Sequence, residues 1–273
     1  MTLLITSVQN TRIKHLVSLR DRRRRELDQQ MLVEGYAELS LAMTVSIPQE
    51  IYYCPPIIRN GSQLHLVQDA LRLGAEVIEV DERVFKKIAY RDDPDGWLGV
   101  FTLRHRRLDD LTLSPVPLLV IAEAIEKPGN LGAILRTADA AGVDAVITCD
   151  SVTDLGNPNV VRSSKGTVFS VQIAESTTIN TLAWLRSKGI VSIAATPRAS
   201  VSYAEVDMSG PVAVAVGAEK PGLTSLWLEQ ADIQVQIPMV GTVNSLNVAT
   251  SAALLVYEAV NQRRRKGLKS LRT

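Results

Sequence analysis

The sequence has little of several residue types on which common catalytic and structural sites depend. It holds two cysteines, Cys54 and Cys149, in 273 residues, and its three histidines are not spaced as a ligand set. Neither a disulfide framework nor a structural zinc site is therefore expected, and we predict no metal. Aromatic residues make up only 4% of the chain, so stacking platforms for nucleic-acid bases are not obvious.

Three motifs of well-known active sites are also missing. Neither half has GxGxxG after its first strand, and GxxxxGK[ST] and GxSxG are absent, so a Rossmann dinucleotide site, a P-loop and a serine hydrolase elbow are not supported. No apolar run approaches the roughly 18–20 residues of a membrane span. The N-terminus lacks the length and basic leader of a signal peptide. We expect a soluble, cytoplasmic protein with no membrane partner.

The charge is unevenly distributed, although the net charge is only +1. Residues 1–25 carry a net charge of +6 and residues 263–272 a further +6, whereas residues 111–260 carry −5. Basic runs of this kind can contact phosphate backbones. A solvated helix face and a basic tail would have the same composition, so both interpretations stay open on charge alone.

Alternating short elements predict two α/β domains. We assign residues 1–107 to a first small domain, residues 108–117, with two prolines, to a linker, and residues 118–273 to a second domain. In the first domain, a single amphipathic helix is expected over residues 10–27. In the second, strands are expected at residues 118–122, 145–148, 168–173, 190–194, 212–216 and 233–237, and helices at 131–141, 179–187, 223–230 and 243–265. Such alternation indicates a mostly parallel sheet, whose ligands bind beyond the carboxyl ends of its strands.

Two loops of the second domain have the same sequence, Glu-Lys-Pro-Gly, at residues 126–129 and 219–222. Each follows a predicted strand, and Pro-Gly favours a type II turn with a positive φ angle at the glycine. After the first loop, Asn130 and Arg136 lie near one face of a predicted helix. Arg136 could form an ordinary ion pair with Asp139 or Glu126, or reach an anionic or polar substrate, and these alternatives are evenly balanced.

Further polar residues stand at the ends of later strands. Gly217 directly follows a strand, where a glycine permits close approach of a ligand to the backbone. Asn244, Ser245 and Asn247 cluster where the chain enters the last predicted helix, and helix capping explains only one of the three. Residues alone therefore predict a ligand-binding α/β domain with polar loops and basic flanks, and they do not name a reaction.

Four segments, in order and at compatible spacing, resemble the SpoU/TrmH group of SPOUT RNA 2′-O-ribose methyltransferases. They are EKPGNLGAILRTADAAG at 126–142, NPNVVRSSKG at 157–166, VGAEKPGL at 216–223, and IPM at 237–239 followed by SLNVA at 245–249. The resemblance covers most of residues 118–260. The N-terminal half, with NTRIK at 10–14, an arginine-rich helix and LVEG at 32–35, more loosely resembles a small ribosomal-protein-like RNA-binding domain.

This resemblance implies an α/β C-terminal domain with a deep trefoil knot, in which the segment from about Val212 threads through an earlier loop. It implies S-adenosylmethionine as cofactor, held by main-chain groups of Gly217, Ile237 and Leu246, with Thr196 as a further candidate. Binding by knot backbone would explain why GxGxxG is missing. The resemblance also implies a homodimer, with the long C-terminal helix packed across the interface.

The same resemblance assigns catalytic roles. Arg136 would act on the ribose 2′-hydroxyl, either as a base or by stabilising the developing alkoxide. Asn130 and Glu219 would orient Arg136 or the ribose, and Ser245 and Asn247 would shape the pocket. Predicted RNA contacts come from the N-terminal basic run and from the loop that precedes the third predicted strand: Arg12, Lys14, Arg22, Arg23, Arg24, Arg25, Arg162 and Ser163.

The expected function is S-adenosylmethionine-dependent 2′-O-methylation of a ribose in structured RNA, with ribosomal (23S) RNA favoured because of the N-terminal domain. A transfer-RNA ribose methyltransferase and a non-catalytic RNA-binding or ribosome-assembly protein on the same fold are the alternatives. Transfer to a base nitrogen is less favoured, since the motifs match the ribose-modifying branch.

Overall fold

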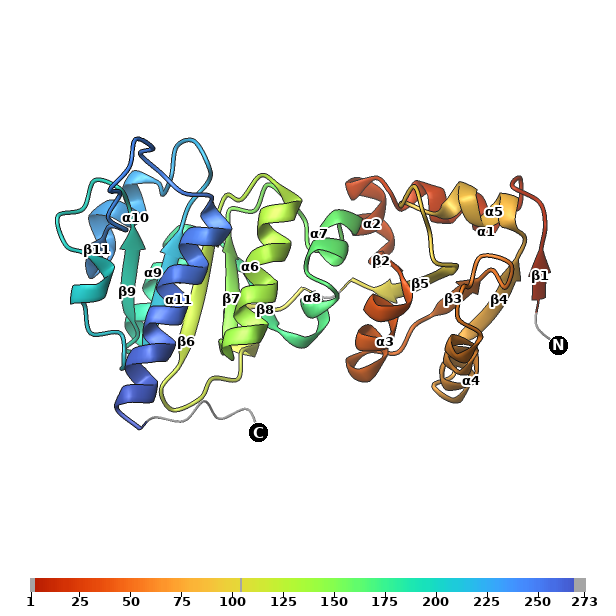
Figure 1. Cartoon of the computed structure of the whole chain (residues 1–273), viewed down its shortest axis with the longest axis horizontal. Helices are drawn as coiled ribbons and strands as arrows, with labels where there is room; N and C mark the ends of the chain where they lie inside the picture. The colour runs from red at the N-terminus through yellow and green to blue at the C-terminus, as the bar shows by residue number, and fades with distance from the viewer. Residues whose placement is uncertain (1–2, 104, 268–273) are drawn as a thin grey trace. The chain divides into compact units, whose positions relative to one another are not determined.

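The structure, a computed structural model, describes residues 3–103 and 105–267 and divides into two compact units (Figure 1). The N-terminal unit comprises Met1–Arg104 and Asp154–Ser170, and the C-terminal unit comprises His105–Thr153 and Val171–Thr273. The segment 154–170, which interrupts the C-terminal unit in sequence, therefore packs with the N-terminal unit. Lys269 and Arg272 of the basic tail lie outside the described residues.

The N-terminal unit is built on a five-stranded mixed sheet in the order β1-β4-β3-β5-β2. The antiparallel pairs are β2–β5 and β3–β5, and the parallel pairs are β3–β4 and β1–β4. Its strands are β1 (Leu3–Ile5), β2 (Gln30–Glu34), β3 (Glu50–Tyr53), β4 (Glu76–Val80) and β5 (Trp97–Thr102). Its helices are α1 (Thr11–Ser18), α2 (Arg22–Asp28), α3 (Tyr36–Val45), η1 (Gly61–Leu64), α4 (His65–Arg72), α5 (Glu82–Ile88), α7 (Pro158–Ser163) and α8 (Thr167–Ser170).

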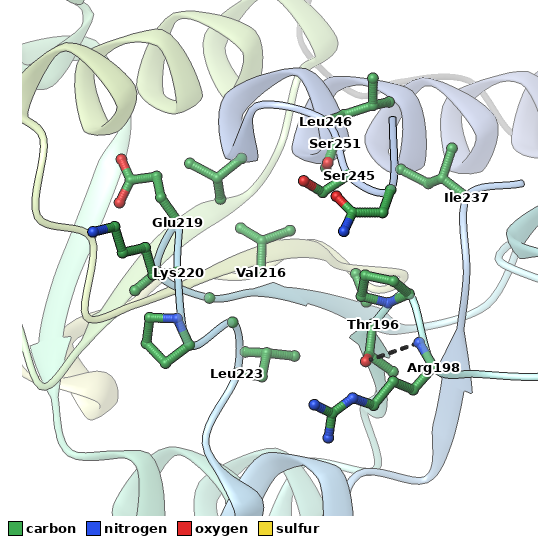
Figure 2. A pocket seen from close by; sticks show the side chains of 18 of the residues that line it. Thr196, Arg198, Val216, Glu219, Lys220, Leu223, Ile237, Ser245, Leu246 and Ser251 are labelled. Atoms are coloured by element: carbon green, nitrogen blue, oxygen red, sulfur yellow. Dashed lines mark hydrogen bonds between the residues drawn. The ribbon is translucent and has the colours of Figure 1, made fainter. Parts of the chain in front are cut away.

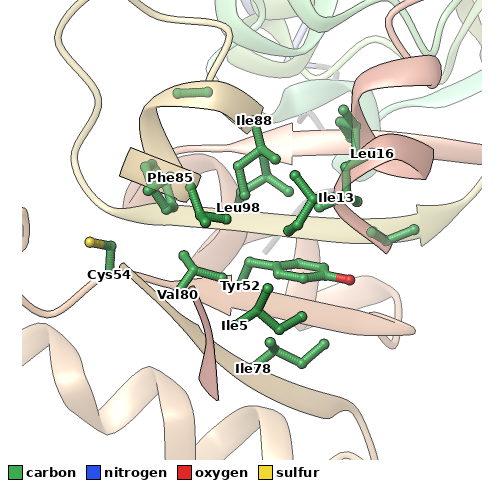
Figure 3. Close-up of a cluster of buried hydrophobic side chains, with 14 of the residues drawn as sticks. Ile5, Ile13, Leu16, Tyr52, Cys54, Ile78, Val80, Phe85, Ile88 and Leu98 are labelled. Carbon is green, nitrogen blue, oxygen red and sulfur yellow. The ribbon is translucent and has the colours of Figure 1, made fainter. Parts of the chain in front are cut away.

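Two apolar clusters hold this unit together. In one, Ile13 of α1 and Phe85 of α5 pack with Tyr52 and Leu98 of the sheet (Figure 3). In the other, side chains of β2, β3 and β5 pack with α3 and α4, and Val161 of α7 belongs to it. Because burying apolar surface is the dominant favourable term in folding, Val161 shows why segment 154–170 folds with this unit.

The basic region expected as one helix over residues 10–27 forms two helices instead. Asn10 caps α1 by accepting a hydrogen bond from the Arg12 amide, and Asp21 caps α2 by accepting one from the Arg24 amide. A side-chain acceptor at an N-cap satisfies an amide that has no partner within its helix, and it favours a new helix start. The second cap therefore breaks the continuous helix that the apolar spacing predicts.

Arg25 does not fit the predicted role in RNA binding, because its side chain is 98% buried. Its Nε and Nη2 atoms donate to the two carboxylate oxygens of Asp154, at 3.0 and 2.7 Å. Its Nη1 atom donates to the Leu19 and Arg20 carbonyls. This buried, bidentate pair joins α2 to segment 154–170, so Arg25 organises the N-terminal unit and is not available to a phosphate.

We predict that Arg25→Ala destabilises the N-terminal unit by about 3–5 kcal/mol, because it leaves the Asp154 carboxylate buried without a partner. The free energy of unfolding, measured in urea by circular dichroism, tests this. The matched control is Arg23→Ala, which removes an exposed arginine of the same helix and should change stability by no more than about 0.5 kcal/mol. Equal stability of the two variants would contradict the structural role.

The C-terminal unit contains a six-stranded, fully parallel sheet in the order β11-β9-β10-β6-β7-β8. Its strands are β6 (Leu118–Glu123), β7 (Ala145–Cys149), β8 (Gln172–Ser176), β9 (Val191–Ala195), β10 (Val212–Val216) and β11 (Ile233–Val235). Its helices are η2 (Leu108–Asp110), α6 (Pro128–Ala141), α9 (Thr178–Ser187), η3 (Tyr203–Glu205), α10 (Ser225–Gln230) and α11 (Val248–Arg265). The near-continuous apolar strands predicted this parallel arrangement, since helices cover both faces.

Helices α6 and α11 lie together on one face of the sheet, and α9 and α10 lie on the other (Figure 1).

The strand expected over residues 168–173 is wrong in its position: residues 167–170 form the short helix α8, and β8 begins at Gln172. Leu108, Leu111 and Leu113 of the expected linker pack on the core of the C-terminal unit. Within residues 3–103 and 105–267, no helix is long and apolar enough to cross a membrane.

Candidate active site

A cavity of about 470 Å³ lies at the carboxyl edge of the C-terminal sheet (Figure 2). Most of its lining comes from four segments: residues 195–198 at the end of β9, 216–223 at the end of β10, 237–239 after β11, and 244–251 at the start of α11. Leu228 of α10 completes it. Strands run parallel here, so their following loops meet at one edge. The volume falls within the range of sites for small molecules and cofactors.

The residues predicted to bind a cofactor all line this cavity. They are Thr196, Gly217, Ile237 and Leu246, and they come from four different segments. Glu219 and Ser245, two of the residues predicted to act in catalysis, line it as well. The fold thus brings these six residues together, and their roles stay predictions.

The loop after β10 doubles back on itself, which explains Gly217. A Cβ atom at this position would lie 2.3 Å from both Gly222 C and Leu223 N. Gly222 has the positive φ angle, 73°, that the Pro-Gly pattern predicts, and its amide donates to the Ala218 carbonyl at 3.0 Å. Gly217 is therefore required for the loop to close. This is a structural reason for the glycine, separate from the close approach of a ligand that the sequence suggested.

The first Glu-Lys-Pro-Gly loop has a different conformation, so the predicted type II turn at Gly129 is wrong. Pro128 is the first residue of α6, and Gly129 continues the helix without a positive φ angle. Proline suits the first helical position because its fixed φ angle is helical and its missing N–H would have no helical partner. Identical tetrapeptides thus start a helix in one place and close a turn in the other.

A chain of hydrogen bonds connects three predicted catalytic residues. Asn247 Nδ2 donates to Asn130 Oδ1 at 3.0 Å, and Asn130 Nδ2 donates to Glu219 Oε1. Asn247 Oδ1 caps α11 by accepting from the Ala249 and Thr250 amides, so this helix begins at Val248 and not at the expected residue 243. Glu219 Oε2 is buried and has no hydrogen-bond partner among the described residues. The series of hydrogen bonds therefore ends at Glu219 in the cavity wall, where one carboxylate oxygen has no hydrogen-bond partner among the described residues.

Arg136 lies on the exposed side of α6 and is not among the residues that line the cavity. Neither of its expected partners, Asp139 and Glu126, binds it, and no other described residue forms a hydrogen bond or ion pair with its guanidinium. An exposed, uncompensated cation is available to an anionic ligand. The ion-pair interpretation therefore has no support among the described residues, and the role of Arg136 in substrate binding stays a prediction.

Sequence reasoning missed Glu123, which is completely buried at the end of β6. Its carboxylate accepts hydrogen bonds from Thr178 Oγ1 at 2.6 Å, Thr224 N at 2.7 Å and Thr224 Oγ1 at 2.8 Å. Thr178 begins α9, and Thr224 follows the loop that forms one wall of the cavity. A glutamate at the end of an otherwise apolar strand was the available signal, since buried carboxylates require hydrogen-bond partners.

Most of the predicted RNA-binding arginines are paired with acids in the N-terminal unit. Arg12 contacts Glu50 and Glu76, and the hydrogen bond that its guanidinium donates to the Glu76 carboxylate raises the pKa of Arg12. Arg22 pairs with Glu26 and Arg24 with Asp28. Lys14, Arg23 and Arg162 are exposed, and none has a side-chain partner in the part of the chain that the structure describes. Arg162 and Ser163 belong to α7, which packs with the N-terminal unit.

Neither cysteine is suited to nucleophilic or metal chemistry. Burial raises the pKa of the Cys149 thiol to about 12 and also raises the pKa of Cys54. Both side chains therefore stay protonated at neutral pH. Among the described residues, no group of three or more His, Cys, Asp or Glu side chains could hold a metal ion.

Comparison with known proteins agrees with this geometry. A family model described as the SpoU rRNA methylase family matches residues 117–257, and one described as an MRM3-like substrate-binding domain matches residues 10–99. The chain belongs to the SpoU rRNA methylase family. The predicted family, the α/β fold with an N-terminal substrate-binding domain and the class of enzyme, an RNA 2′-O-ribose methyltransferase, are thereby confirmed.

Relatives and solved structures extend over most of the chain. The 23S rRNA (guanosine(2553)-2′-O)-methyltransferase RlmP of Bacillus subtilis is 27% identical, over 93% of this chain and 97% of its own. The 23S rRNA (guanosine-2′-O-)-methyltransferase RlmB of Shewanella oneidensis is 37% identical, over 73% and 83%. The crystal structure of an rRNA methyltransferase from Sinorhizobium meliloti with bound AdoMet matches with a TM-score of 0.87 at 29% identity, over 98% and 99%. This bound ligand confirms the predicted cofactor of the family.

We predict that Glu123→Ala weakens cofactor binding at least about tenfold, because it removes the acceptor that holds the buried Thr178 hydroxyl and the Thr224 amide and hydroxyl beside the cavity. Calorimetric titration with S-adenosylmethionine measures the Kd. Glu229→Ala, which removes an exposed carboxylate from α10, is the matched control and should bind normally. If both variants bound the cofactor equally well, Glu123 would not position the loop.

Proposed function

We propose that this chain transfers a methyl group from S-adenosylmethionine to a ribose 2′-hydroxyl in structured RNA, with 23S ribosomal RNA as its substrate. The observation that carries the proposal is the cavity into whose wall the Asn247–Asn130–Glu219 hydrogen-bond chain leads. The ribosomal substrate is supported by RlmP, a 23S rRNA methyltransferase by name, which aligns with both units. Such a protein acts in the cytoplasm, where ribosomal RNA is found.

The cavity fits the cofactor in shape and chemistry. Val216, Leu223, Ile237 and Leu246 give it apolar walls suited to an adenine ring, and backbone groups of the closed loop 217–222 line one side. The unpartnered Glu219 oxygen offers an acceptor to a hydroxyl or amino group. When bound, the cofactor supplies an electrophilic methyl group, and these residues would hold it at the sheet edge.

The protein must also orient the ribose and handle a proton. A 2′-hydroxyl is a weak nucleophile until its proton is removed or its developing negative charge is stabilised. Arg136 has no hydrogen-bond or ion-pair partner for its guanidinium among the described residues, and it stabilises charge without needing to deprotonate. Asn130 stands six residues before it on α6 and is fixed by two hydrogen bonds, which suits an orienting role.

We predict that Arg136→Ala lowers methyl transfer at least about 100-fold, the size of effect seen when a single charge-stabilising donor is removed from an active site. Transfer of radiolabelled methyl groups from S-adenosylmethionine to unmodified 23S rRNA measures the rate, and transfer RNA serves as the comparison substrate. Cofactor affinity should stay within about twofold, because Arg136 does not line the cavity. Near-normal turnover would remove Arg136 from the mechanism, and absence of transfer by the unmodified protein would favour a non-catalytic RNA-binding role.

We also infer a homodimer and a knotted chain. α6 and α11 pack together, and Leu254 and Tyr257 of α11 are 37% and 43% exposed in one copy. Large apolar side chains exposed on one helix favour a protein partner. The knot is proposed from the family resemblance, and the strand order, with β10 between β6 and β9, agrees with it. Arg136 lies outside the cavity wall of its own copy, so a second copy or the RNA has to complete the site.

We predict that Leu254→Glu shifts the protein from dimer to monomer, because it places a charge in a desolvated apolar contact. Sedimentation equilibrium at micromolar concentration measures the mass. The matched control is Leu71→Glu, which introduces the same charge on the exposed side of α4. A monomeric starting protein would remove the dimer proposal.

A further inference from the structure

The N-terminal unit contains a second cavity, of about 560 Å³, that no predicted site explains. It is lined by Arg20, Lys86, Lys87, Ala89, Tyr90, Arg91, Asp92 and Pro94. We call it the basic cleft. Four of the eight lining residues are cations and one is an acid, so the cleft favours anionic ligands.

The basic cleft is held in shape by its own hydrogen bonds. Arg20 Nη2 donates to the Lys87 and Ala89 carbonyls, at 3.1 and 2.7 Å, and so places a positive charge at the C-terminal end of α5. That end carries a partial negative charge, which would otherwise repel a phosphate. Lys86 contacts Glu82, whereas Lys87 is exposed and has no side-chain partner in the described parts of the chain.

Tyr90 is the exposed aromatic residue of the cleft, and its position is fixed at both ends. Tyr90 is 39% exposed, so its ring is accessible to a ligand. Its amide donates to Glu34 Oε2 at 2.7 Å, and its hydroxyl accepts a hydrogen bond from Asn159 Nδ2 at 3.2 Å. A preorganised ring binds a flat partner with little loss of conformational freedom.

Arg91 pairs with Glu38, so Arg20 and Lys87 are the lining cations without an acid partner among the described residues. A fixed aromatic ring beside such cations is the combination that binds single-stranded nucleic acid. Bases stack on the ring, and the cations track the phosphates. Asn159 belongs to α7, and Arg162, exposed and unpartnered among described residues, follows it by nearly one helical turn on the same side of that helix. Arg162 does not line the cleft, but it adds an exposed cation to the helix that contacts Tyr90.

We propose that the basic cleft binds an unpaired segment of the RNA substrate, with a base stacked on Tyr90 and the adjoining phosphates contacting Lys87 and Arg20. This inference rests on the proposed function, in that RNA is taken to be the substrate. It adds the recognition of an unpaired nucleotide, away from the cavity that would hold the cofactor. Double-stranded RNA does not offer such a base, because its bases are stacked within the helix.

Fluorescence anisotropy of the full-length protein tests the proposal with two probes: a fluorescein-labelled, unstructured 12-nucleotide RNA of mixed sequence, and a 12-base-pair RNA duplex. Tyr90→Ala should raise the Kd for the single strand about tenfold, whereas Tyr90→Phe, which loses only the hydroxyl, should stay within about twofold. Lys87→Ala should lower the slope of log Kd against log salt concentration by about 0.7. Arg72→Ala, the same loss of charge on α4 outside the cleft, should leave the Kd nearly unchanged.

Equal affinities of Tyr90→Ala and Tyr90→Phe for the single strand would overturn the stacking contact, and so would duplex binding as tight as that of the single strand. Thermal melting of each variant confirms that it is folded. Methyl transfer by the protein without substitutions separates this inference from the proposed function. If that protein methylates 23S rRNA and the cleft variants have a normal KM for it, only this inference fails. If it binds the single strand through Tyr90 and transfers no methyl group, only the proposed function fails.

Discussion

The buried carboxylate of Glu123 is the interaction on which the candidate active site depends. A carboxylate removed from water is costly unless hydrogen bonds replace its hydration, and here three donors from Thr178 and Thr224 do so. Those donors belong to the start of α9 and to the residue that precedes α10. The carboxylate at the end of β6 therefore fixes the start of α9 and the residue before α10. Because Thr224 directly follows the loop 217–223, this loop is held in place before any ligand binds. Gly217 adds to this constraint, since only a glycine lets the loop close against its own backbone.

Much of the C-terminal unit could be predicted because its information is local. Apolar strands covered on both faces indicate a parallel sheet, and the carboxyl edge of such a sheet collects the loops that follow its strands. Thr196, Gly217 and Ile237 meet in one cavity for that reason, although about 40 residues of sequence separate the first from the last. Helix starts were less predictable. Asn247 was one of three cap candidates, and it could not be singled out as the cap of α11 because the apolar pattern continues upstream of it through Leu246 and Val243.

The N-terminal unit depends on contacts between distant residues, which a local sequence pattern cannot predict. Arg25 stands in a run of four arginines, and nothing local distinguishes it from its neighbours. Its partner, Asp154, is 129 residues away and follows a segment of the other unit. The arrangement of segment 154–170 depends on this pair and on Val161, and neither contact leaves a periodic signal. Contacts between residues far apart in the sequence therefore decide that segment 154–170 folds with the N-terminal unit. They also decide that Arg25 is buried and cannot bind RNA.

The charge distribution acquires a different meaning in the folded protein. Arg12, Arg22 and Arg24 are each paired with a nearby carboxylate, and Arg25 is buried, so most of the +6 charge of the first 25 residues is compensated within the unit. Exposed ion pairs of this kind are weak and can exchange partners with phosphates, but each exchange leaves an acid uncompensated near the RNA. Lys14, Arg23 and Lys87, which have no side-chain partner among the described residues, lie on three different helices of the N-terminal unit. Electrostatic attraction from such scattered charges gives affinity without selectivity, so selectivity for one RNA has to come from shape and stacking at fixed positions.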